Sequence, residues 1–239
     1  MRKNKLEIIF EDQNVLVLKK IPGTAVIPQE DKSTDDIMLF KVNDYLKHES
    51  FPVISLDVDA SGTVLFAKNK DTYNYIAEQL KNSKVKRTYH IIVNGIMEED
   101  KGEIRKRLIV DKTDTVVSEK GIDAVTKYEV KEQFKNFAFV EVVPVTSRKK
   151  QIRAHFWSIG NPLAIDGLYA SSEHLLLSKL KKRYKGVEKE KPLLSRLPLH
   201  LSKIELFLPD NENISIFEMP LPDDINITLK QLRKYNKRG

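Results

Sequence analysis

The stretch SLDVDASGTVLFAKN, from Ser55 to Asn69, places two acidic residues, a serine and a glycine between two apolar runs. The flanking runs FPVISL and TVLFAK are rich in β-branched and aromatic residues, which favours two strands. Asp, Ser and Gly are residues that turns use for side-chain to backbone bonds and for positive φ. The segment therefore predicts a strand, a turn and a strand. Asp57 either only shapes this turn or is also a catalytic carboxylate.

A calcium loop is a third interpretation, because the pattern D-x-D-x-S-G resembles the start of such a loop. That loop needs a bidentate carboxylate at its twelfth position and a helix on each side. The twelfth position is Lys68, and both flanks predict strands. The absence of cysteine also removes thiolate metal ligands and disulfides. We therefore expect no metal site.

The composition is that of a globular chain in a reducing compartment. With 239 residues and 41% hydrophobic content, the chain can bury the core of one large domain or two small ones. No linker between domains is evident, so we expect one domain over residues 1–239. The apolar run near the N-terminus is short and ends at Glu11, so neither a signal peptide nor a membrane span is predicted. We expect a cytoplasmic location.

The charge points to a polyanionic partner. The formal net charge is +7, and clustered Lys and Arg bind phosphates by releasing counterions. Any one basic run is also explained as a solvated surface, but together the runs favour nucleic acid. The runs are SKVKR (83–87), RKK (148–150), KLKKRYK (179–185) and RKYNKR (233–238).

The pattern along the chain alternates short strands with a few helices. Helical periodicity appears in DTYNYIAEQLKN and in SRKKQIRAHFWSIG, where a serine is the expected start signal. Residues 171–196 are expected to be partly helical, and a short helix closes the chain. His155, His200, Phe156 and Trp157 have apolar neighbours and are expected in the core. The predicted strands are LEIIF with VLVLK as a hairpin, TYHIIVNG, AVTKYEVKEQ paired with FAFVEVVPV, LHLSKIELFLP and NISIFEMPLP.

Five motifs in order resemble the catalytic domain of the RluA family of pseudouridine synthases over nearly the whole chain. ISLDVDASG is similar to the family's His-Arg-Leu-Asp-x-x-Thr-Ser-Gly signature, and TSRKKQIRAHFWSIGNPLAIDGLYA to its Gly-Arg-x-His-Gln-Ile-Arg helix with the following Gly-Asp-x-x-Tyr turn. The other three are KRTYHIIVNG, AVTKYEV and RLPLHLSKIELFLP. The chain begins at the catalytic domain, so we expect no S4-type RNA-binding domain before it.

The resemblance assigns roles to single residues. Asp57 would be the nucleophile, Arg153 the arginine that pairs with its carboxylate, and Tyr89 a ring that lies against the uracil. For Tyr89, an ordinary core position is an equally good interpretation. Gly62, Gln151, Asp166 and Tyr169 are matches that we expect to be structural. No metal or organic cofactor is implied.

RNA contacts are expected from Arg87 and from Arg148, Lys149 and Lys150 at a predicted helix start. The chain departs from the family at Ser55, where the family has an arginine that enters the RNA stack. A serine cannot fill that space, so another side chain must assist, or the target base must already be unpaired.

These observations predict an α+β pseudouridine synthase fold, with a largely antiparallel sheet, flanking helices and a central basic cleft. The expected activity is isomerisation of uridine to pseudouridine in structured RNA, ribosomal or transfer, by a monomer that needs no protein partner. The alternative is a noncatalytic RNA-binding protein that keeps the fold, which the missing arginine makes worth weighing.

Overall fold

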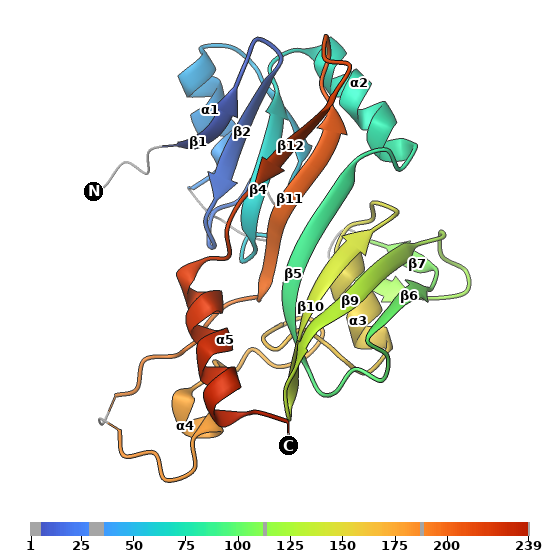
Figure 1. Cartoon of the computed structure of the whole chain (residues 1–239). Helices are drawn as coiled ribbons and strands as arrows, with labels where there is room; N and C mark the ends of the chain where they lie inside the picture. Colours follow the sequence, from blue (N-terminus) through green and yellow to red (C-terminus); the bar gives the residue numbers. More distant parts are fainter. Residues whose placement is uncertain (1–5, 29–35, 112–113, 187–188, 239) are drawn as a thin grey trace. The chain divides into compact units, whose positions relative to one another are not determined.

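The computed structural model describes residues 6–28, 36–111, 114–186 and 189–238 (Figure 1). The chain divides into two compact units, and the strands β5 (Lys86–Asn94) and β11 (Leu199–Phe207) carry it from one unit to the other and back. We expected one catalytic domain over residues 1–239, and this division into units does not test that prediction. Unit 1 comprises Met1–Arg87 and Leu201–Met219, and unit 2 comprises Thr88–His200 and Pro220–Gly239.

Unit 1 is a twisted sheet with two helices (Figure 1). Within it the strand order is β1-β2-β4-β11, with β3 beside β4 and β12 beside β11. The pairs β1–β2, β2–β4, β3–β4 and β11–β12 are antiparallel. Its other elements are β1 (Glu7–Glu11), β2 (Val15–Lys20), α1 (Met38–Leu46), β3 (Phe51–Ile54), β4 (Ser61–Ala67), α2 (Lys70–Lys81) and β12 (Ile214–Glu218).

The sequence explains why β4 is central in this unit. All seven of its residues are buried, as expected for a strand with neighbours on both edges and side chains covered on both faces. The helix α2 follows directly, and the Asn69 side chain caps it by accepting the Thr72 N–H at 2.8 Å. At the other end of α2, the Gln79 amide donates to the Phe207 carbonyl at 2.8 Å and accepts the Phe207 N–H at 3.1 Å. These bonds fasten α2 to the end of β11.

Unit 2 contains the sheet β5-β10-β9-β6, whose three pairs are antiparallel, and a separate β7–β8 hairpin. Its main apolar cluster includes Ile92 and Phe139 from the sheet together with Ile225, Leu229 and Leu232 from α5. The other elements of unit 2 are β6 (Lys101–Arg105), β7 (Leu108–Val110), β8 (Thr115–Val117), β9 (Val125–Gln133), β10 (Phe137–Pro144), α3 (Gln151–Ser158), α4 (Leu177–Leu180) and α5 (Asp223–Tyr235).

The start of α3 differs from the prediction. No serine caps this helix; the N-cap residue is Lys150, in the left-handed conformation with φ 53°, and it makes no side-chain cap bond. The Gln151 side chain instead ties down the turn before the helix, because its Oε1 accepts the Arg148 N–H at 3.1 Å and the Thr146 hydroxyl at 2.9 Å. The expected structural role of Gln151 is thus confirmed.

Most long elements lie where the sequence predicts them, and the α+β class with a mostly antiparallel sheet is confirmed. In the segment 171–196, which we expected to be partly helical, the only α-helix among the described residues is the four-residue α4. The helix α1 and the short strands β6, β7 and β8 were not predicted. No helix in the described segments is long and apolar enough to cross a membrane.

Gly62, the second residue of β4, permits a close approach of two backbones within unit 1. Its φ is +136°, and a Cβ there would lie 2.5 Å from the backbone N and O of Leu201. We expect Gly62→Ala to lower the free energy of unfolding by roughly 2–4 kcal/mol, because both the dihedral angle and the contact are unfavourable. Gly23→Ala is the matched control, since Gly23 has φ +85° but nothing within 4 Å of a Cβ. Equal losses in urea denaturation would contradict the importance of the contact.

Candidate active site

Asp57 lies in the turn that joins β3 to β4. The turn is closed by the Ala60 N–H, which donates to the Asp57 carbonyl at 3.1 Å. The Asp57 side chain is half-buried, whereas Ser55 and Asp59 on either side are exposed. The strand–turn–strand prediction is therefore confirmed. A turn and a catalytic carboxylate do not exclude each other, so the role of Asp57 stays a prediction.

A buried lysine holds this turn through bonds to its backbone carbonyls. Lys20, at the end of β2, is 1% exposed, and its Nζ donates to the carbonyls of Val58 and Ala60, both at 2.7 Å, and of Ile21 at 3.2 Å. The Val58 carbonyl also accepts the Gly23 N–H at 2.9 Å. An ammonium group has three protons to donate, and charge-assisted bonds are the stronger ones. The backbone around Asp57 is thus fixed by a cation that the sequence analysis did not single out.

Arg153, on α3 in unit 2, is held in a two-point ion pair. Its Nε donates to Asp166 Oδ2 at 2.8 Å, and its second guanidinium nitrogen donates to Oδ1 at 2.6 Å. The Arg153 side chain is 11% exposed and that of Asp166 is fully buried. Asp166 Oδ1 also accepts the N–H groups of Leu168 and Tyr169. Because two guanidinium nitrogens bond to the two carboxylate oxygens, the plane of the guanidinium is fixed.

The sequence analysis gave Asp166 a structural role in a corner, and the structure shows that this corner holds Arg153. The sequence contained an indication of this role, because Asp166 directly follows the largely apolar stretch GNPLAI. A carboxylate buried among such residues needs a partner for its charge. The expected pairing of Arg153 with the carboxylate of Asp57 is a separate matter and stays a prediction.

Two tyrosines matched motifs. Tyr89 on β5 is 7% exposed, which fits both a core residue and a ring that lines a dry pocket. Tyr169 lies with its ring centre 5.3 Å from Arg153 Cζ, and its hydroxyl donates to the Thr115 carbonyl at 2.6 Å. Burial raises the pKa of Tyr169 to about 12, so this phenol stays protonated and keeps donating at neutral pH.

The basic residues expected to bind RNA differ in exposure. Arg148 and Lys149 are exposed and Lys150 is half-buried, all just before α3, whose first turn carries no acidic residue. Arg148 also donates from Nε and from a terminal nitrogen to the Asp123 carbonyl, both at 3.3 Å. Arg87 is only 8% exposed, so it is not a surface cation in this structure. RNA contact stays a prediction for all four residues.

His155, which the sequence predicts to be in the core, is fully buried on α3. Its Nε2 bonds to the Lys106 carbonyl at 3.0 Å and its Nδ1 to the Thr126 hydroxyl at 2.9 Å, so both ring nitrogens are satisfied. Burial lowers the pKa of His155, which favours the neutral ring. The structure thus confirms a core histidine.

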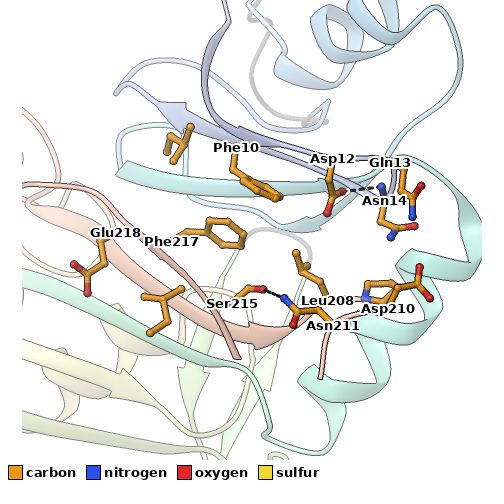
Figure 2. Close-up of a pocket in the computed structure, with 13 residues that line it drawn as sticks. Phe10, Asp12, Gln13, Asn14, Leu208, Asp210, Asn211, Ser215, Phe217 and Glu218 are labelled. Atoms are coloured by element: carbon orange, nitrogen blue, oxygen red, sulfur yellow. Dashed lines mark hydrogen bonds between the residues drawn. The ribbon is translucent and has the colours of Figure 1, made fainter. Parts of the chain in front are cut away.

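One hollow of unit 1 contains none of the predicted site residues. Its volume is about 810 Å³, and it lies between the β1–β2 and β11–β12 turns (Figure 2). Its lining includes Asp12, Asp210 and Glu218 but neither Lys nor Arg. Such a lining repels phosphate, so this hollow is not our candidate for the RNA site.

The residues described so far supply a fixed carboxylate turn, a fixed guanidinium and a basic helix start. No group of three or more His, Cys, Asp or Glu residues in the described parts of the chain is placed to hold a metal ion.

Several known proteins with similar sequences are named as RNA pseudouridine synthases. Residues 14–158 match the family described as RNA pseudouridylate synthase. An uncharacterized RNA pseudouridine synthase of Bacillus subtilis, YhcT, is 30% identical over 92% of this chain and 70% of its own length. The dual-specificity RNA pseudouridine synthase RluA of Vibrio cholerae is 30% identical over 70% of each chain. The ribosomal large subunit pseudouridine synthase D of Neisseria meningitidis is 31% identical over 95% of this chain and 61% of its own.

Solved structures agree on the fold, which is that of pseudouridine synthases. The human RNA pseudouridylate synthase domain containing 4 has a TM-score of 0.71 at 22% identity and matches 95% of this chain and 93% of its own. The chain belongs to the RluA family of RNA pseudouridine synthases, isomerases that convert uridine in RNA to pseudouridine.

The buried lysine gives a direct test of how the turn is held. We expect Lys20→Met to lower the free energy of unfolding by roughly 2–5 kcal/mol, because methionine keeps the stem but removes the charged donor from the carbonyls of Val58 and Ala60. Lys19→Met is the matched control on the same strand, since Lys19 is exposed and bonds only Glu7 among the contacts described for it. We expect less than about 1 kcal/mol there. Similar losses in both variants, measured by urea denaturation, would show that Lys20 does not hold the turn.

Proposed function

We propose that this chain isomerises specific uridines of structured RNA, ribosomal or transfer, with Asp57 as the nucleophile. The observation that carries the proposal is the position of Asp57: it stands at the aspartate of the family signature, in a turn fixed by Lys20. The names of relatives point to ribosomal RNA, since several are ribosomal large subunit synthases. The net charge of +7 suits any RNA substrate.

The reaction is an isomerisation of one nucleotide, so its atomic composition and its oxidation state stay the same. The bond from uracil N1 to ribose C1′ breaks, the base turns, and a bond from C5 to C1′ forms. N1 gains the proton that C5 loses. A carboxylate at the sugar or the ring can hold the intermediate covalently, and exclusion of water protects the detached base. This balance requires no cofactor.

Arg153 and Tyr89 receive supporting roles. A carboxylate in a dry pocket tends to take up a proton unless a cation favours its charged form. In our proposal Arg153 supplies that cation, and Asp166 keeps its guanidinium in one plane. Tyr89 lies against the uracil and assists proton transfer. These roles rest on the matching motifs and on the burial of both side chains.

Substrate capture falls to the cations before α3. The backbone N–H groups of a helix start favour phosphate, and Arg148, Lys149 and Lys150 add side-chain charge there. Ser55 is exposed and too small to displace a base from a duplex. In our proposal the target uridine is therefore unpaired in the folded RNA, where extrusion costs least.

Replacing the nucleophile is the main test. We expect Asp57→Asn to reduce pseudouridine formation by roughly 10⁴-fold or more while RNA binding is kept, because the amide has the same shape but is a poor nucleophile. Asp59→Asn, two residues on in the same turn and exposed, is the matched control and should stay active. Mapping pseudouridines in RNA from cells that carry either variant would also identify the target uridine.

Unchanged turnover in Asp57→Asn would remove the assignment of Asp57. A wild-type chain that binds RNA and forms no pseudouridine in any cellular RNA would instead support the noncatalytic alternative.

Salt dependence tests the capture site. If Lys149 and Lys150 each contact a phosphate, replacing both with alanine should flatten the slope of log affinity against log salt by about 0.7 to 0.9 per lost contact. Saturating single-turnover rates should change little, because the chemistry does not use these side chains. The comparison pair is Lys182→Ala with Lys185→Ala, in another exposed basic run. A slope that changes only in that pair would place the RNA along residues 179–185.

A further inference from the structure

Trp157 occupies a position that the sequence analysis predicted wrongly. We expected Phe156 and Trp157 both to lie in the core, and Phe156 is indeed fully buried. The Trp157 side chain, however, is 48% exposed at the last turn of α3. Burying an aromatic ring of this size is strongly favourable, so a half-exposed indole on a rigid helix needs an explanation.

The indole is part of a small aromatic and cationic cluster within unit 2. Trp157 and Arg153 are four residues apart on α3 and therefore share one face of the helix. The Tyr169 ring lies near both, with its centre 6.1 Å from that of Trp157 and 5.3 Å from Arg153 Cζ. The cluster of Arg153, Tyr169 and Trp157 thus extends from a buried ion pair to the surface.

The cluster is held in place by the β7–β8 hairpin. The Tyr169 hydroxyl donates to the Thr115 carbonyl at 2.6 Å and accepts the Thr115 N–H at 3.3 Å. The Thr115 hydroxyl in turn donates to the Lys149 carbonyl just before α3, at 2.7 Å. Because its neighbours are fixed, the exposed indole loses little conformational freedom when something packs on it.

Cations lie near both ends of α3. Lys106 Nζ donates to the Ser158 carbonyl at 2.7 Å, directly beside Trp157 in the chain. At the other end are Arg148, Lys149 and Lys150, about 10 Å away for a helix of eight residues. Positive charge thus lies just before the first residue of α3 and at its last turn, which also carries the exposed indole.

We propose that Trp157 is a stacking platform for an unpaired nucleobase of the RNA. Proteins hold single-stranded RNA by combining cationic contacts to the backbone with aromatic rings on which bases stack. The inference rests on the proposed function, since it takes RNA as the substrate and Arg153 as part of its site.

Because Trp157 is the sole tryptophan of the chain, its fluorescence reports on this site alone. In the Asp57→Asn variant, which blocks turnover, we expect a saturable quench when a short RNA hairpin with unpaired loop uridines is added. Heparin is the matched control, since it offers anionic groups to the same cations but has no bases. RNA that binds without a quench, or an equal quench by heparin, would overturn the proposal.

Substitution gives a second test. Trp157→Ala should weaken binding of the hairpin by about 5-fold to 100-fold, the range expected for one lost base stack. Trp157→Phe should recover part of that loss, because a smaller ring still stacks. Tyr75→Ala on α2 is the control for loss of an exposed aromatic ring, at 43% exposure, and should bind normally. In turnover, Trp157→Ala should raise KM and leave the saturating rate nearly unchanged.

The outcomes separate this inference from the proposed function. Normal pseudouridine formation without a fluorescence response would remove the stacking role and keep the enzyme. A quench with base-dependent binding but no turnover in the wild-type chain would keep the stacking role and remove the catalytic proposal. Equal hairpin affinity in wild type, Trp157→Ala and Trp157→Phe would assign the exposed indole to another contact, such as a protein partner.

Discussion

A buried ammonium group holds the backbone on which Asp57 lies. Lys20 reaches from the end of β2 to the carbonyls of Val58 and Ala60, so one strand fixes the turn between two others. Burying a lysine is costly unless its protons are all used, and here backbone oxygens accept them. The carboxylate that we propose as the nucleophile is therefore carried by backbone that other strands hold in place, which is what preorganisation of a reactive group needs.

Unit 2 uses the same strategy with the opposite charge. Asp166 is fully buried and accepts from two backbone N–H groups as well as from the Arg153 guanidinium. Breaking such a pair would leave an uncompensated charge in the interior, so the geometry is strongly retained. The Tyr169 ring then continues the fixed arrangement outward to Trp157. One end of this cluster is thus buried and fixed by an ion pair, and its other end is a half-exposed indole.

The sequence predicts those features that depend on local pattern. Alternating β-branched runs located β3, β4, β9 and β10, and helical periodicity located α2 and α3. Motif order located Asp57 and Arg153 as candidates. What it missed depends on contacts between distant segments: Lys20 beneath a turn 38 residues away, and the Asp166 partner of Arg153. The exposure of Trp157 was mispredicted because α3 packs its opposite face inward, and periodicity over eight residues did not reveal which face that is.

The close approach of Gly62 on β4 to β11 has a consequence for biosynthesis. The backbone that Gly62 approaches belongs to β11, which is made about 140 residues later. Because β4 has β11 as a neighbour in its sheet, the emerging polypeptide carries an incomplete sheet edge while unit 2 is being translated. Contacts so distant along the chain form slowly. Because synthesis runs from the N- to the C-terminus, the sheet around the Asp57 turn is completed only after most of the chain has been made. Until then the exposed edge of β4 can pair with other chains, so correct folding requires that the nascent chain does not aggregate during this time.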